Sequence, residues 1–150
     1  VVQAPPAKPL IAAVEGYALA GGLELMIACD LVVANANAKF GIPEVKRGLV
    51  AAAGGVMMLP DQIPERIALE LALTGDFIGA ERAYQLGLIN EVTEGSALDG
   101  AKALAAKIAA LQPLDKVGQP AGTRVELRPE RLSADRMVAA FGDATSHLAV

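Results

Sequence analysis

Two short, uninterrupted apolar runs, joined by a helical segment, constrain the fold of this chain most strongly. Residues 10–14 and 31–34 contain only nonpolar side chains and are each followed by polar or turn-forming residues. Runs of this kind are typical of strands buried on both faces, so we expect residues 10–14 to form a central strand. Residues 21–29 between them predict a packed helix. Strand, helix and strand within about two dozen residues predict a right-handed βαβ unit, a mostly parallel sheet and the α/β class.

The rest of the chain alternates predicted helices and short strands. Helical spacing and end signals predict helices at residues 43–47, from 51–55 onward, and at 64–73, 80–86 and 97–111. Short strands are expected at residues 38–40 and 88–92, and a turn at 16–18. We therefore expect a core over residues 1–110 and a divergent, partly helical tail over residues 111–150.

Composition and charge exclude several classes of function. The chain has 150 residues, of which 53% are hydrophobic and 20% charged, enough for one domain core. Its apolar runs are too short to span a bilayer, so we expect no membrane segment, and residues 1–8 show no targeting signal. A net charge of −4 without a basic stripe argues against nucleic acid as a partner. The single cysteine, Cys29, fits a reducing compartment, so we expect the cytoplasm.

Two glutamates are the candidate catalytic residues. Glu24 falls in the first turn of the helix that Gly21 and Gly22 open, and Glu44 follows Pro43, a residue type favoured at the first helical position. The free N–H groups of a helix start can hold a developing negative charge. One carboxylate can remove a proton while the other donates one or holds a water, which suits hydration or proton shuttling beside an activated carbonyl.

The same residues also have a purely structural interpretation. Acids in the first turn of a helix commonly offset its dipole and cap its N–H groups, and by spacing alone this is the commoner role. The small-residue turns at 18–22 and 51–55 can serve tight packing as well as the close approach of a ligand. Other chemistries find less support, because the sole histidine, His147, lies in the tail and no cluster has metal-ligand spacing.

Several motifs then identify a resemblance. They are residues 8–25, Ala28-Cys29-Asp30, Phe40-Gly41-Ile42-Pro43-Glu44, Gly54-Gly55 and Leu73-Thr74-Gly75-Asp76, in this order. Over roughly residues 8–110 the chain resembles the enoyl-CoA hydratase/isomerase (crotonase) family. The resemblance implies a crotonase-like ββα spiral, incomplete at the N-terminus, with a helical C-terminal region.

The resemblance also implies a reaction, the reversible addition of water to a 2-enoyl-CoA thioester in fatty-acid or related acyl-CoA metabolism. In this reading the two glutamates hold the water and backbone N–H groups form an oxyanion hole. No metal and no cofactor are implied, because CoA is part of the substrate, and the family forms trimers or dimers of trimers. The implied site residues are Glu24 and Glu44 for catalysis, Gly21 and Gly22 for the oxyanion, and Ala53 and Gly54 for the acyl pocket.

The chain departs from the family pattern at both ends. An upstream segment resembling Ala-Gly-x-Asp, which in the family supplies the second oxyanion amide and much of the CoA site, has no counterpart here. Residues 111–150 do not resemble the helices that complete the family's pocket. Two alternatives therefore stay open: a catalytically inactive remnant of the crotonase fold, and an isomerase or another CoA-thioester lyase.

Overall fold

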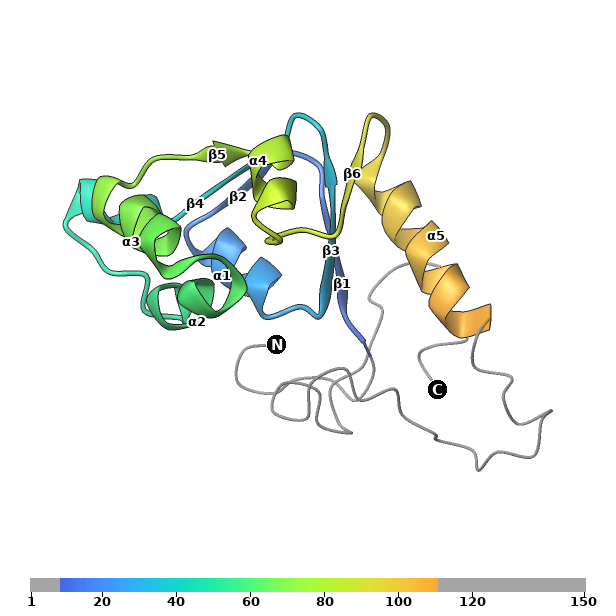
Figure 1. Ribbon diagram of the computed structural model, residues 1–150, viewed down its shortest axis with the longest axis horizontal. Coiled ribbons are helices and arrows are strands. Elements are labelled where there is room, and N and C mark those ends of the chain that lie inside the picture. Colours follow the sequence, from blue (N-terminus) through green and yellow to red (C-terminus); the bar gives the residue numbers. More distant parts are fainter. Residues whose placement is uncertain (1–8, 111–150) are drawn as a thin grey trace, which may run out of the picture.

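Two three-stranded sheets form the framework of the computed structural model, which describes residues 9–110 (Figure 1). The first sheet has the order β1-β3-β6 and is parallel, with β1 at Ile11–Val14, β3 at Leu31–Asn35 and β6 at Glu91–Thr93. The second has the order β2-β4-β5, with β2 at Tyr17–Leu19, β4 at Lys39–Gly41 and β5 at Ile78–Gly79. Its β2 and β4 are parallel, and β5 is antiparallel to β4. The predicted tail at 111–150 lies outside the described residues.

The chain passes from the first sheet to the second twice, and each pass ends in helices. β1 leads through Glu15 and Gly16 into β2 and then into α1 (Gly21–Ile27). β3 leads into β4, the 3-10 helix η1 (Pro43–Arg47), α2 (Gly55–Gln62) and α3 (Glu65–Thr74). After β5 come α4 (Ala80–Gln85), β6 and α5 (Ala97–Ala110). Because each pass adds one strand to each sheet, the chain forms the ββα spiral that the resemblance implied.

The two faces of β1 pack into two different cores. Ile11 packs with Val33 and the inner face of α5, whereas Val14 belongs to the main core shared with α1 and the other helices. The largest fully buried side chains are Phe40, Ile11, Leu23, Leu59 and Val33. A strand covered on both faces gains from nonpolar residues at every position, which explains the continuous apolar run.

Three strand predictions need correction. β1 lies at an edge of its sheet in the described part of the chain, not at the centre. The apolar run correctly predicted that both faces of β1 are covered, but a run of this kind does not indicate which strands pair beside it. Residues 17–19 form β2 where a turn at 16–18 was expected, because pairing with β4 holds this short, small-residue strand. The strand expected at 88–92 is shifted to Glu91–Thr93.

The helix predictions agree with the structure within a few residues at their ends. The longest described helix, α5, has 14 residues. None of the helices within residues 9–110 has the length and apolar character to cross a bilayer.

Candidate active site

The two candidate glutamates follow neighbouring parallel strands. The N–H of Ala20 donates a 3.0 Å hydrogen bond to the carbonyl of Gly41, which extends the β2–β4 pairing beyond Leu19. Glu24 follows Ala20 within one helical turn, and Glu44 follows Gly41 just as closely. Because parallel strands end at a common edge, both acids belong to the carboxyl-terminal edge of the second sheet.

Glu24 is buried and is held by the start of α2. The residue is 5% exposed, and its Oε1 accepts a 2.9 Å hydrogen bond from the N–H of Gly55. Gly55 is the first residue of α2, so this N–H has no acceptor within its own helix. Glu24 therefore lies in the first turn of α1 but caps α2, a structural role that spacing along α1 could not predict.

Gly55 has no space for a side chain. A Cβ there would lie 2.9 Å from the Cβ of Ala51 and 3.1 Å from Cγ and Oε1 of Glu24. The sequence analysis singled out the Gly54-Gly55 pair as a place of close approach but did not identify Glu24 as the group that approaches. Gly55 is thus a positioning residue for Glu24 that the glycine pair could have indicated.

Glu44 lies in η1 with one carboxylate oxygen unsatisfied. Pro43 occupies the first position of this helix, as the sequence predicted, and Glu44 is half-buried in its first turn. Oε2 of Glu44 is buried and has no hydrogen-bond partner among the described residues. A buried polar atom without a partner costs free energy, so it calls for an explanation. One explanation is that Oε2 of Glu44 accepts a hydrogen bond from a bound molecule during binding or catalysis.

The loop after α3 fixes η1. Lys46 forms a 2.8 Å ion pair with Asp76. The hydrogen bond from Lys46, and then its charge, lower the pKa of Asp76. Nζ of Lys46 also lies 5.7 Å from the centre of the Phe77 ring. The ion pair is exposed and by itself adds little stability. Packing is tighter, because a Cβ on Gly41 would lie 2.7 Å from Cδ1 of Phe77. The segment that carries Glu44 is therefore held against the end of β4.

Gly21 and Gly22 are the first two residues of α1 and are both exposed. At a helix start their N–H groups lack intrahelical acceptors. Since α1 has only seven residues and not the nine expected, these N–H groups matter more than a helix dipole. Ala20 just before them has φ 52° and ψ −128°, a strained conformation for a residue with a Cβ. Strain of this kind is enriched at functional sites, and no local sequence pattern indicated it.

The predicted acyl-pocket residues lie in the loop before α2. Gly54 is the N-cap of α2 with φ 120°, and its carbonyl accepts hydrogen bonds from the N–H groups of Met57 and Met58. Gly54 thus adjoins the Gly55 N–H that holds Glu24. Ala53 beside it is exposed. The structure gives no further test of an acyl pocket here, so that role stays a prediction.

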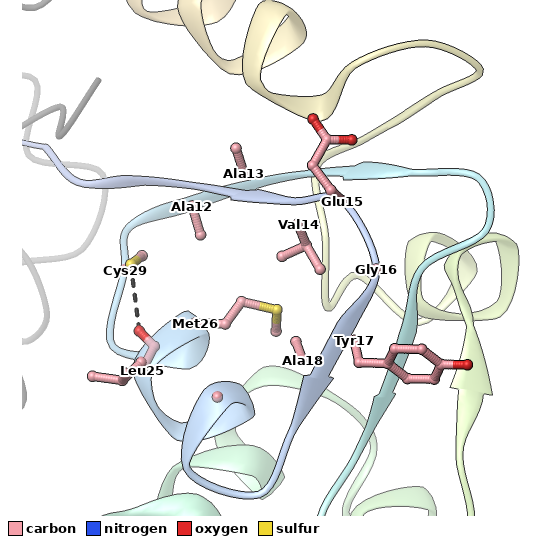
Figure 2. Close-up of a pocket in the computed structure, with 11 residues that line it drawn as sticks. Ala12, Ala13, Val14, Glu15, Gly16, Tyr17, Ala18, Leu25, Met26 and Cys29 are labelled. Atoms are coloured by element: carbon pink, nitrogen blue, oxygen red, sulfur yellow. Dashed lines mark hydrogen bonds between the residues drawn. The ribbon is translucent and has the colours of Figure 1, made fainter. Parts of the chain in front are cut away.

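A cleft of about 340 Å³ lies between β1, β2 and α1 (Figure 2). Ala12, Val14 and Met26 point into it, and Gly22 lines it, so it reaches the start of α1. Cys29 lies in its wall and donates from Sγ to the carbonyl of Leu25 at 3.4 Å. Sequence analysis did not predict this cleft, because its walls come from three elements of unremarkable composition.

The sequence matches a known family model, described as enoyl-CoA hydratase/isomerase, over residues 4–119. The (E)-benzylidenesuccinyl-CoA hydratase of Thauera aromatica is 50% identical over 108 residues, which cover 71% of this chain and 42% of that protein. The carnitinyl-CoA dehydratase of Escherichia coli K12 is 44% identical over 108 residues, covering 71% of this chain and 41% of that protein.

The fold is also similar to solved structures of hydratases and dehydratases that act on CoA thioesters. An enoyl-CoA hydratase from Mycobacterium marinum superposes with a TM-score of 0.72 at 63% identity, covering 76% of this chain and 47% of that one. A carnitinyl-CoA dehydratase from Mycobacterium avium has a TM-score of 0.69 at 56% identity, covering 73% of this chain and 43% of that one. The chain thus spans less than half the length of these four relatives.

Proposed function

Because the chain belongs to the enoyl-CoA hydratase/isomerase family, we propose that it catalyses the reversible addition of water to a 2-enoyl-CoA thioester. The observation that carries this proposal is the pair of glutamates at one sheet edge, Glu24 anchored by Gly55 and Glu44 with an unpaired buried oxygen. The names of the relatives, two hydratases and two dehydratases of CoA thioesters, support the same reaction class.

In the proposed mechanism Glu24 and Glu44 hold one water between them. One glutamate, as a carboxylate, accepts a proton as the water oxygen bonds to the β-carbon of the enoyl group, and the other, as a protonated carboxyl group, donates its proton to the α-carbon. Between these two steps the thioester oxygen carries negative charge. The N–H of Gly21, which adjoins the N–H of Gly22, stabilises this charge. Nothing is oxidised or reduced, so the reaction needs no redox cofactor, and the CoA is part of the substrate.

Hydration of crotonyl-CoA, followed as loss of absorbance at the enoyl band, tests this proposal. Glu44→Gln and Glu24→Gln keep the shape of each side chain but remove its capacity to exchange protons. Each is expected to lower the rate by about 10² to 10⁴. Glu65→Gln is the matched control, since Glu65 is a glutamate in the first turn of α3 but is exposed. Equal rates for the chain and both variants would exclude the assignment.

A non-catalytic role is the second candidate. The family resemblance places a second oxyanion amide in a segment without a counterpart in these 150 residues, and loss of one oxyanion donor alone commonly costs about 10² or more in rate. No hydration above background by the chain and both glutamine variants would support this role. An isomerase would instead shift the double bond without incorporating water, which mass analysis of the product distinguishes.

Family resemblance further supports a homotrimer or a dimer of trimers, and the single cysteine supports a cytoplasmic location. Light scattering of the purified chain tests the first proposal through the molar mass, expected at three or six times that of one chain. Fractionation of the source cells tests the second. Activity unchanged by dialysis against a chelator would support a reaction without a metal.

A further inference from the structure

The ring of Phe77 packs against the strand end that leads to Glu44. Phe77 belongs to the loop between α3 and β5, residues 75–77 (Figure 1). A Cβ on Gly41, the last residue of β4, would lie 2.7 Å from Cδ1 of Phe77 and 2.8 Å from the carbonyl oxygen of Asp76. Gly41 is buried, so the loop leaves no space for a side chain where the chain turns toward Glu44.

Gly75, in the same loop, packs against the other side of the Glu44 segment. It is buried, and a Cβ there would lie 3.1 Å from Cγ1 of Val45 and 3.1 Å from Cγ of Lys46. These two residues directly follow Glu44 in η1. The chain is therefore in close contact with one loop both before and after Glu44.

The loop is itself held at both ends. At its start, the N–H of Gly75 donates a 2.9 Å hydrogen bond to the carbonyl of Leu71, which closes α3. At its end, Ile78 pairs with Phe40 in the antiparallel ladder of β4 and β5. A loop anchored in this way keeps the residues that pack against it in a defined place.

Gly41 also joins the Glu44 segment to the segment that carries Glu24. Its carbonyl accepts the 3.0 Å hydrogen bond from the N–H of Ala20, the residue that precedes α1. A displacement of Gly41 would therefore change the position of Glu44 relative to Glu24. Two acid–base groups that act on one substrate need a fixed separation, since a misplacement of about 1 Å can lower a rate about 10²-fold.

The ion pair between Lys46 and Asp76 is a weaker constraint on this segment. The two side chains are 51% and 71% exposed. Water and salt screen exposed charges, so a pair of this kind contributes little. The contacts at Gly41 and Gly75 are buried, and packing is not screened. Packing is therefore the stronger of the two constraints.

We propose that Phe77 and Gly75 are positioning residues for Glu44 and hold its carboxyl group where the acid–base reaction requires it. The positioning comes from packing and not from the Lys46–Asp76 ion pair. This inference rests on the proposed function for the role of Glu44, but the place of the Glu44 carboxyl group can be measured without turnover.

Phe77→Ala removes the ring that packs against Gly41. Phe77→Leu is the conservative variant, because leucine fills part of the same space with an apolar side chain. Tyr84→Ala is the matched control, since Tyr84 is an aromatic residue on α4 that is 51% exposed, close to the 47% of Phe77.

Gly75→Ala tests the other side of the segment independently. Gly75 has φ 67°, so alanine there is strained as well as crowded. Gly87→Ala is the matched control, because Gly87 has φ 79° and a Cβ there meets nothing within 4 Å. It shares the backbone strain but not the contact. Asp76→Asn, in turn, removes the charge of the ion pair and keeps the size of the side chain.

NMR of the full chain, labelled with carbon-13 at its glutamate carboxyl groups, reports the surroundings of Glu44. The Glu44 signal is identified by its absence from Glu44→Gln. We expect this signal to shift in Phe77→Ala and Gly75→Ala, and to return toward its original place in Phe77→Leu. It should keep its place in the three controls, and the Glu15 signal should stay unchanged in every variant. Thermal unfolding shows which variants keep their fold.

Hydration of crotonyl-CoA is expected to show the same pattern in kcat. Phe77→Ala and Gly75→Ala should lower kcat about tenfold or more and leave KM within about twofold, because they disturb proton exchange and not substrate binding. Phe77→Leu should recover most of the loss. A change that merely lowered stability would leave kcat per folded molecule unchanged.

Three results would overturn the inference. One is a Glu44 signal that Phe77→Ala and Gly75→Ala move no further than their controls do. Another is an equal shift in Asp76→Asn, because the ion pair would then do the positioning. The third is an unchanged kcat in both variants when Glu44→Gln has lost activity. Failure of the proposed function is a different result, equal hydration by the original chain and Glu44→Gln, and it does not affect the carboxyl signal.

Discussion

The N–H of Gly55 donates a 2.9 Å hydrogen bond to Oε1 of Glu24, across 31 positions of sequence. This bond joins the start of α2 to the first turn of α1. It satisfies one N–H of α2 and holds one oxygen of a buried carboxylate in place. The carboxylate that the proposed reaction uses is therefore positioned by a helix other than its own.

Gly55→Ala is expected to lower the free energy of unfolding by about 1–3 kcal/mol, because its Cβ would lie 2.9 Å from the Cβ of Ala51 and 3.1 Å from Glu24. Urea unfolding at neutral pH measures the change. Gly95→Ala is the control, since a Cβ on Gly95 meets nothing within 4 Å. Equal stabilities of the two variants would show that Glu24 does not pack closely against α2.

Ala20→Gly is expected to raise the free energy of unfolding by about 1 kcal/mol. Ala20 has φ 52° and ψ −128°, a conformation that glycine adopts without steric cost. The flexibility that glycine adds to the unfolded chain offsets part of the gain. Urea unfolding of Ala20→Gly and of Ala18→Gly, the latter in regular β2, separates the two effects. Destabilisation of both variants by the same amount would contradict strain at Ala20.

Glu15→Gln is expected to make stability less dependent on pH in acid. The pKa of Glu15 lies below its ordinary value of 4.5, because its carboxylate accepts hydrogen bonds from the N–H groups of Leu98 and Ala97 and from the Ser96 hydroxyl. Since the folded-state pKa is the lower one, the stabilisation is complete above pH 4.5 and is lost as the pH falls through the folded value.

Urea unfolding between about pH 6 and 3 measures this dependence. The original chain should lose more stability over that range than Glu15→Gln does. Glu70→Gln, a change at an exposed glutamate of α3, should retain the full dependence. If the two variants follow the same curve, the contact between the β1–β2 corner and α5 does not stabilise the fold.

Local patterns predicted the elements whose determinants are local. The spacing of Ile67 and Leu71 indicated α3, and the Pro43-Glu44 pair indicated the helical turn of η1. β2 was missed because three residues, one of them Ala18, carry no periodic signal and are a strand only through pairing with β4.

The site was predictable in its components but not in its contacts. The motifs indicated Glu24, Glu44 and the small residues around them. The hydrogen bond from Gly55 to Glu24 and the unpaired oxygen of Glu44 depend on how distant segments meet, which a single sequence does not encode in any local pattern. The family resemblance supplied the spiral, and the apolar run predicted that both faces of β1 are covered, but the run did not indicate that β1 lies at the edge of its sheet within residues 9–110.

Alkylation of Cys29 by iodoacetamide at pH 8 is expected to be about a hundredfold slower in the folded chain than in urea. Burial, and secondarily the charge of Asp30, raise the pKa of the Cys29 thiol from 9.0 to about 11, and only the thiolate reacts. The rate in the folded chain should therefore keep rising with pH up to about 11. Because Cys29 is the only cysteine, mass spectrometry of the intact chain reads the reaction directly. A rate that levels off near pH 9, as for an exposed thiol, would mean that the wall of the cleft is open to solvent at this position.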